Sequence, residues 1–226
     1  MFIRSLLISL AVLWVVFSQN VIAFEKGDFL IRGGSATVSP NDSSSNVSLG
    51  GADLGFDINV QKETQLGLTL AYFLTEKISL ELLLSTPFKH ELDFGVENPL
   101  GTGGRLGEIT HLPPTLSLNY YLNPNSSSNF QPYLGAGINY MIFFDEEFSS
   151  ANEAIGLDNL DLENTFGLAF QAGVDYRIND KFFVNTAIRW IDVNTVADFD
   201  LNGVDGDVER VEIDPWVFTF SLGYVF

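Results

Sequence analysis

The chain has 226 residues, of which 29 are acidic and 11 are basic, so its formal net charge is -18. A charge of this sign disfavours self-association and binding to nucleic acid, because like charges repel. There is no cysteine, which excludes disulfides, thiolate metal sites, a cysteine nucleophile and a lipid-anchoring cysteine. The hydrophobic content of 46% is high for so acidic a chain, and nothing in the sequence indicates a cofactor.

The N-terminus has the features of a secretory signal peptide. Arg4 supplies a positive charge, the segment Leu6 to Phe17 is almost entirely apolar, and Val21-Ile22-Ala23 resembles a cleavage site. The apolar run is about 12 residues long, whereas a membrane-spanning helix needs about 20. We therefore expect residues 1–23 to be removed on export, with an uncleaved anchor as the alternative. Residues 24–226 then form the mature domain.

The mature chain alternates between bulky apolar residues and small or polar residues in eight segments. In the last of them, Trp216, Phe218 and Phe220 alternate with smaller residues. This alternation is typical of membrane-spanning strands, whose bulky side chains face lipid while small and polar ones face the interior. Without a long apolar helix, a closed barrel is the structure that satisfies all backbone groups in lipid. The segments are 28–38, 64–74, 78–88, 112–122, 132–144, 166–178, 182–193 and 216–226.

Short and long connections alternate between these segments. Outer-membrane barrels have short periplasmic turns and longer external loops, and an even strand number places both chain ends in the periplasm. The sequence therefore predicts an all-β fold, an eight-stranded antiparallel transmembrane β-barrel of the outer-membrane type. The expected turns are 75–77, 123–129 and 179–181, and the expected loops are 39–63, 89–110, 146–164 and 199–209.

Aromatic residues that should face outward gather at both ends of the predicted strands. Such residues are enriched where membrane hydrocarbon meets water, so we expect a lipid-contacting band between two aromatic girdles. The turn-side residues are Tyr72, Tyr120, Tyr176, Phe182, Tyr224 and Phe226, and the loop-side residues are Phe88, Tyr140, Phe144, Phe166, Trp190 and Trp216.

Several stretches, taken together, resemble the outer membrane protein W family over essentially the whole mature chain. They are Arg32 to Val38, Thr64 to Leu68, Glu81 to Leu83 with Thr86 to Phe88, His111 to Leu116, Pro132 to Tyr140, Gly173 to Tyr176, Asp214 to Phe218, and the terminal Phe226. The resemblance implies an outer-membrane barrel with a narrow, largely apolar lumen that is associated with passage of small hydrophobic molecules. We also expect Phe226 to engage the outer-membrane assembly machinery. The acidic external loops depart from the family pattern.

Four charged residues are expected to point into the lower and middle lumen: Arg32, Glu81, Asp175 and Arg189. An eight-stranded barrel is just wide enough for side chains to fill it, and charges in a low dielectric must be paired. We therefore predict a polar plug that blocks water. The alternative is a network that only supports folding, and both roles are compatible.

Toward the loop side the inward residues become apolar: Val38, Leu83, Met141, Phe143, Ile191, Val193 and Val217. They predict a hydrophobic cup that is open to the outside and binds a ligand, with simple packing as the alternative for each residue.

Prolines mark the external ends of the third and fourth predicted strands. Pro87 ends the third strand, and Pro113 and Pro114 begin the fourth. Proline removes a ladder donor, so pairing between these two strands should be poor near the external rim. We predict a lateral opening into the membrane at this point; the alternative is that the prolines merely end the strands.

Two other chemistries receive weak support. Some outer-membrane barrels are enzymes, but nothing identifies a nucleophile beside His90 or His111, so no enzyme is predicted. A calcium-loop spacing is present, yet strands rather than helices should flank it, and Asp205 stands where that loop has an apolar residue. The candidate ligands would be Asp198, Asp200, Asn202 and Glu209.

Two classes of function follow from this interpretation. In the first, a small hydrophobic ligand enters the apolar lumen and leaves sideways into the membrane. In the second, a structural, adhesion or receptor barrel displays acidic external loops to a partner. An ion-conducting pore is disfavoured because side chains crowd the lumen.

Overall fold

The computed structural model describes residues 24–41, 43–44, 48–49, 52–53, 58–94, 101–102, 104–124 and 128–226. The predicted signal peptide lies outside the described residues. Among these residues, no helix has the length and the apolar character that a membrane-spanning helix needs.

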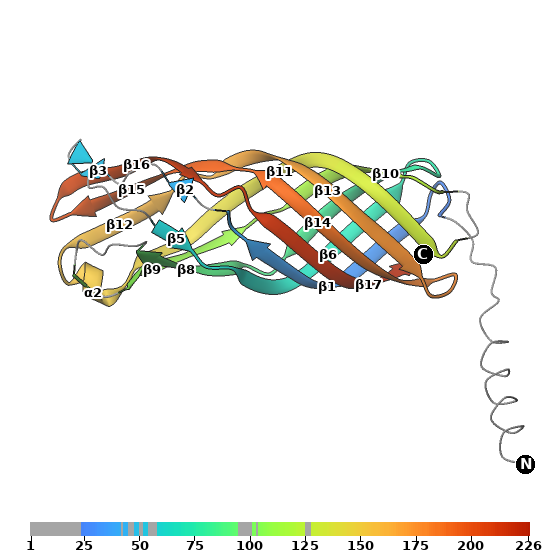
Figure 1. Ribbon diagram of the computed structural model, residues 1–226, viewed down its shortest axis with the longest axis horizontal. Coiled ribbons are helices and arrows are strands. Elements are labelled where there is room, and N and C mark those ends of the chain that lie inside the picture. Colours follow the sequence, from blue (N-terminus) through green and yellow to red (C-terminus); the bar gives the residue numbers. More distant parts are fainter. Residues whose placement is uncertain are drawn as a thin grey trace, which may run out of the picture.

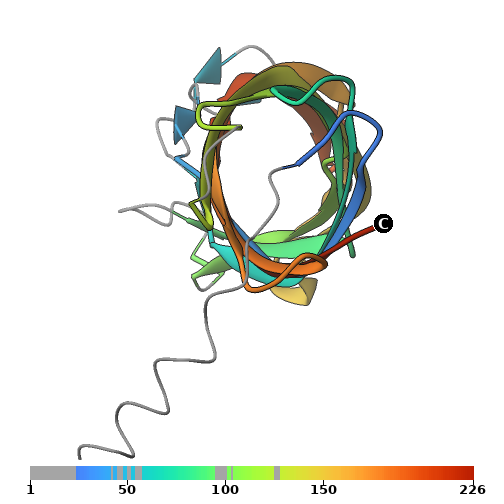
Figure 2. The same ribbon diagram turned by 90° about the vertical axis from the view of Figure 1, so that its right-hand side faces the viewer.

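Eight strands close into one antiparallel barrel, as the sequence predicts (Figures 1 and 2). They are β1 (Phe29–Ser39), β6 (Glu63–Phe73), β7 (Ile78–Ser85), β10 (Thr115–Tyr121), β11 (Phe130–Phe148), β13 (Thr165–Arg177), β14 (Phe182–Asp192) and β17 (Trp216–Val225). Their order is β10-β7-β6-β1-β17-β14-β13-β11, and pairing of β10 with β11 closes the ring. A closed ring leaves no sheet edge to be satisfied in lipid.

The two ends of the mature chain meet at the turn side of the barrel. β1 pairs with the last strand, β17, from Leu30 opposite Val225 to Ser39 opposite Trp216. The amide of Phe226 donates to the carbonyl oxygen of Phe29 at 2.9 Å. The start of β1 and the C-terminus lie at the same end of the molecule in Figure 1. The even number of strands therefore brings both ends of the mature chain to the turn side, as the sequence predicts.

The outer wall of the barrel is apolar. Leu66, Ile138 and Phe220 expose 52% to 70% of their side chains, as is expected of residues that contact lipid and not water. The rings of Tyr140 and Phe166 stack at 4.4 Å near the external end of this band. We take these two residues, together with Trp216, as the external limit of the membrane-spanning part.

The predicted long connections alternate with short turns as expected, but where the structure describes them the wall continues beyond this limit as paired strands (Figure 1). These strands are β2 (Ser43–Ser44), β3 (Ser48–Leu49), β4 (Ala52–Asp53), β5 (Ile58–Val60), β8 (Phe88–Phe94), β9 (Arg105–Leu112), β12 (Leu157–Leu162), β15 (Asn194–Leu201) and β16 (Val204–Glu212), with one short helix, α2 (Ser150–Glu153). Where their side chains are described, the outer faces carry acidic residues such as Glu91 and Asp198, while the inner faces keep an apolar alternation.

Phe88 corrects one part of the predicted aromatic girdles. It is only 1% exposed and points inward, although alternation from Ile78 places it outward. The irregular residues Thr86 and Pro87 separate β7 from β8, and the inward residues change from odd numbers in β7 to even numbers in β8. A slip of one residue moves every following side chain to the opposite face.

Gly33 and Gly34 are neighbours in β1 with opposite surroundings. A Cβ on Gly34 would overlap the Phe220 carbonyl oxygen and the Ser221 backbone, whereas a Cβ on Gly33 would meet nothing within 4 Å. We predict that Gly34→Val destabilises the barrel by about 1–3 kcal/mol, because β1 must move away from β17. Gly33→Val is the matched control, expected within about 0.5 kcal/mol of wild type. Urea unfolding of the refolded proteins measures both, and equal destabilisation would contradict this packing.

Candidate functional site

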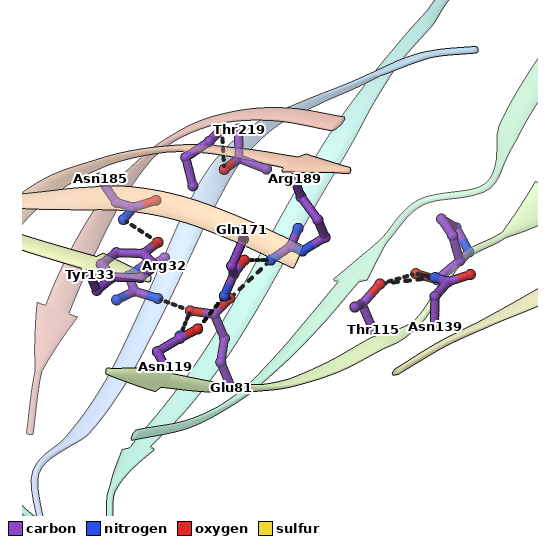
Figure 3. A network of polar contacts seen from close by, with 12 residues as sticks. Arg32, Glu81, Thr115, Asn119, Tyr133, Asn139, Gln171, Asn185, Arg189 and Thr219 are labelled. Atoms are coloured by element: carbon purple, nitrogen blue, oxygen red, sulfur yellow. Dashed lines mark hydrogen bonds and ion pairs between the residues drawn. The ribbon is translucent and has the colours of Figure 1, made fainter. Parts of the chain in front are cut away.

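A cluster of buried charges crosses the half of the lumen nearer the short turns (Figure 3). Arg32 donates from Nη1 to Glu81 Oε2 at 2.7 Å and from Nη2 to Asp175 Oδ2 at 2.8 Å. Arg189 donates from Nη2 to the other Glu81 oxygen, Oε1, at 3.0 Å. All four residues are buried and come from four different strands. The structure thus brings together the four residues that the sequence proposes for a polar plug.

Neutral side chains take up the remaining bonding capacity of these carboxylates. Asn119 and Gln171 donate to Glu81 at 2.9 and 3.1 Å. Tyr121 and Asn185 both donate to Asp175 at 2.8 Å. Buried charges are tolerated when they are paired and fully hydrogen-bonded, and this arrangement meets that condition for both carboxylates. The luminal polar network, as we call it, consists of Arg32, Glu81, Asp175 and Arg189 with Asn119, Tyr121, Tyr133, Gln171 and Asn185.

An aromatic cluster lies below the luminal polar network, at the periplasmic mouth. Phe24, the first residue after the expected cleavage site, is 1% exposed, with ring centroids 4.8 Å from Phe73 and 5.7 Å from Phe183. The Arg177 guanidinium carbon lies 4.6 Å from the centre of the Phe24 ring. Sequence reasoning missed this cluster, because residues before the first strand carry no periodic signal.

Above the luminal polar network lies an apolar cavity of about 90 Å³, which we call the upper cavity. It is enclosed mainly by the strands beyond the membrane limit, so it sits higher than the sequence suggests. Its lining residues are Val38, Pro40, Ile58, Val60, His90, Leu92, Leu106, Ile109, His111, Met141, Phe143, Phe148, Leu157, Leu160, Leu162, Ala197, Phe199, Leu201, Val208, Val211, Ile213 and Pro215.

Three of the seven residues proposed for the apolar lumen, Val38, Met141 and Phe143, line the upper cavity. The other four are buried but do not line it. Ile191, Val193 and Val217 pack in the same hydrophobic cluster, while Leu83 lies opposite Thr115 in the β7–β10 ladder. Alternation along a strand identifies inward residues, but it does not give the depth at which the lumen stops being filled.

Two histidines form a pair in the wall of the upper cavity. The ring planes of His90 and His111 differ by 6°, and their Nε2 atoms are 3.0 Å apart. His90 Nδ1 donates to the Gln61 carbonyl oxygen, so neutral His90 accepts at Nε2 from His111 Nε2. Burial lowers the pKa of both rings, that of His111 to about 3 with a further contribution from His90. The pair is therefore uncharged at neutral pH and keeps the wall apolar.

The predicted weakness between the third and fourth strands coincides with an interruption of the ladder. Pairing of β7 with β10 stops at Leu83 opposite Thr115 and resumes between β8 and β9 at Phe88 opposite His111. Between these rungs four residues, Leu84 to Pro87, lie opposite three, Leu112 to Pro114. We call this segment the ladder break. It contains Pro87, Pro113 and Pro114, and it lies directly below the histidine pair.

The candidate calcium ligands lie on one hairpin. Asp198 and Asp200 are in β15, and Asn202 occupies the two-residue turn to β16 with φ of 52°. Asn202 Nδ2 donates to the Ile155 carbonyl oxygen at 3.1 Å. In the part of the chain that the structure describes, no group of three or more His, Asp or Glu residues could hold a metal ion. The calcium hypothesis gains no support from this geometry, and the side chain of Glu209 lies outside the description.

We expect the free energy of unfolding to depend on the balance of buried charges in the luminal polar network more than on which residue is replaced. Glu81→Met leaves Arg189 without its carboxylate, and an unpaired buried charge costs about 3–5 kcal/mol. The double variant Glu81→Met/Arg189→Met removes one charge of each sign and keeps the Arg32–Asp175 pair, so we predict that it recovers at least half of that loss. Urea unfolding of the refolded single and double variants measures the coupling. Additive losses in the double variant would contradict a coupled network.

Comparison with known proteins agrees with this architecture. The model of the OmpW family matches residues 25–226. The chain is 42% identical to outer membrane protein W of Vibrio cholerae serotype O1 over 217 residues, which cover 96% of this chain and 97% of that protein. It resembles the crystal structure of the outer membrane protein OprG from Pseudomonas aeruginosa with a TM-score of 0.85 and 40% identity, covering 91% of this chain and 99% of that one.

A further relative is the dibenzothiophene metabolism operon protein PahQ of Pseudomonas aeruginosa. It is 33% identical over 127 residues, which cover 55% of this chain and 54% of that protein. The family match spans nearly the whole mature chain, and the barrel, its register and its apolar outer band are those of an outer-membrane protein. The chain therefore belongs to the OmpW family of outer-membrane β-barrels.

Proposed function

We propose that this barrel passes small hydrophobic molecules across the outer membrane by a lateral route. A molecule enters the upper cavity from outside, cannot continue through the luminal polar network, and leaves through the ladder break into the membrane. The exit is defined by Pro87, between β7 and β8, and by Pro113 and Pro114, directly before β10.

The observation that carries this proposal is the order of environments along the lumen. An apolar cavity lies above a layer of fully paired buried charges, and the interruption in the barrel wall lies between them. Transfer of an apolar molecule from water into the cavity is favourable, whereas its transfer into the charged layer is not. Lipid beside the ladder break is the remaining apolar environment.

The name of one relative supports an apolar ligand. PahQ is named for an operon of dibenzothiophene metabolism, and dibenzothiophene is a flat aromatic molecule without a hydrogen-bond donor. A ligand of this class matches a cavity whose lining is almost entirely hydrocarbon and whose two histidines already bond to each other. We therefore use dibenzothiophene as the test molecule.

The charge distribution favours a second candidate, a barrel that displays an acidic surface to a cationic partner. Of the 29 acidic residues, 23 fall in the segments 39–64, 86–112, 143–164 and 192–214, together with only 4 basic residues. Such a field attracts positively charged partners over distances of about a Debye length. This role needs no cavity and no exit, which separates it from transport.

Filling the upper cavity should stop passage of the ligand. Ala197 is buried in its lining, whereas Ala136 faces lipid on β11. We predict that Ala197→Phe lowers uptake of dibenzothiophene to the background of cells without the barrel, because the added ring occupies the cavity. Ala136→Phe is the matched control and should transport at the wild-type rate. Depletion of dibenzothiophene from the medium measures uptake, and the heat-induced shift of the band on SDS gels verifies that each variant is folded.

Wild-type uptake by folded Ala197→Phe would contradict the transport proposal. That result would leave the acidic display surface as the better account of the molecule.

A further inference from the structure

Both margins of the ladder break are fastened to the strands behind them. On the β7 margin, the Thr86 amide donates to the Leu66 carbonyl oxygen at 2.9 Å. The Thr86 hydroxyl accepts from the Leu66 amide at 3.2 Å and donates to Gln65 Oε1 at 2.8 Å. Thr86 therefore continues the register of β7 on β6 and directs its hydrogen bonds away from the break.

On the opposite margin, the chain keeps its register on β11 through both prolines. Leu112 lies opposite Ile142, and Thr115 lies opposite Asn139, so two residues lie between the rungs on each strand. Between them the Tyr140 amide donates to the Pro114 carbonyl oxygen at 3.0 Å. This margin is thus held to β11 without any slip, while the other side of the same segment slips by one residue against β7 and β8.

The carbonyl of Pro113 is the group that could close the break. Successive carbonyls along a strand point to opposite neighbours, and that of Pro114 points to β11. In a regular strand the Pro113 carbonyl would therefore face β7 and β8, but Pro113 and Pro114 lie between β9 and β10, and Asn139 Nδ2 also lies 3.3 Å from the Pro114 carbonyl oxygen. The Pro113 carbonyl is bonded from inside the lumen instead, by Asn139 Nδ2 at 3.0 Å and by the Thr115 hydroxyl at 3.1 Å.

Asn139 and Thr115 act as one unit at this point (Figure 3). Asn139 Nδ2 also donates to Thr115 Oγ1 at 2.9 Å, so the hydroxyl accepts a hydrogen bond from Asn139 and donates one to the Pro113 carbonyl oxygen. Asn139 is fully buried, and its Oδ1 has no hydrogen-bond partner among the residues that the structure describes. An unpaired buried oxygen lowers stability, so packing alone would favour an apolar residue here. The Asn139 side chain therefore contributes through its amide nitrogen, which bonds Pro113 and Thr115.

We propose that Asn139 and Thr115 are positioning residues for lateral release, a role that rests on the proposed function. They bond the Pro113 carbonyl from within, so that it neither recruits a donor from the β7–β8 margin nor offers a bare acceptor to water. The break stays unpaired, and the Pro113 carbonyl is not a bare acceptor, while Ser85 Oγ on the other margin has no hydrogen-bond partner among the described residues. Occupation of the Pro113 carbonyl favours ligands that lack a hydrogen-bond donor, such as fused aromatic hydrocarbons and heteroaromatics.

The test uses two near-isosteric variants, Asn139→Leu and Thr115→Val, in the full-length barrel. Thr69→Val is the matched control, because Thr69 is also a buried, inward-facing threonine but lies on β6, with Leu83 of β7 between it and Thr115. Three quantities are measured: dibenzothiophene uptake by cells, dibenzothiophene binding to the refolded barrel by fluorescence, and exchange of the backbone amides from Leu84 to Phe88 by NMR.

Release of the Pro113 carbonyl should let it bond across the break. We expect uptake to fall about tenfold and protection of one amide in Leu84 to Phe88 to rise about tenfold, the effect of one ordinary hydrogen bond. Binding should stay unchanged because the upper cavity is intact. Thr69→Val should match the wild type in all three measurements.

Wild-type uptake and wild-type amide exchange in Asn139→Leu would overturn the inference. Loss of binding together with uptake would also overturn it, since that result indicates a general structural role. These outcomes are separable from failure of the transport proposal, which is decided by filling the cavity at Ala197. If Ala197→Phe blocks uptake and Asn139→Leu does not, passage through the upper cavity stands and only the positioning role fails.

Discussion

The pairing of buried charges inside a barrel only eight strands wide constrains everything else in this molecule. The wall leaves room for side chains but not for a solvated channel, so each ion in the lumen must be neutralised by another side chain. Glu81 receives both arginines, one on each oxygen, and Arg32 carries the pairing on to Asp175. These contacts join strands that are distant in sequence, and we propose that they close the lumen to anything that must pass straight through it.

If the luminal polar network seals the lumen, a molecule in the upper cavity must leave by another route. The upper cavity has an almost entirely apolar lining, and its two histidines are neutral because burial lowers the pKa of each ring. The wall beside it is interrupted where prolines remove ladder donors, and the margins of that interruption bond to β6 and β11 and not to each other. We propose that the barrel does not conduct along its axis and that a hydrophobic molecule leaves by this side route.

Sequence periodicity predicts the barrel and the charged residues well, because lipid outside and a crowded interior impose opposite demands on successive residues. It identifies Arg32 and Glu81 as inward, and pairing then follows from electrostatics. It fails where the period changes phase: the slip at Pro87 turns Phe88 inward, and no local signal marks that slip. It also mistakes the acidic hairpins for loops, because composition hides their alternation. Leu83 is misplaced for a third reason, since periodicity gives the direction of a side chain but not its depth.

The central claim is that the luminal polar network seals the axis of the barrel, and ion conductance tests it most directly. The refolded wild-type protein would be inserted into a planar bilayer and its current recorded over a range of voltages at neutral pH. The account predicts no steady conductance above that of the bare bilayer, because paired side chains fill the lumen between Arg32 and Arg189. A large, stable, ohmic conductance would contradict it, since a water-filled path along the axis would then exist and the side exit would be unnecessary.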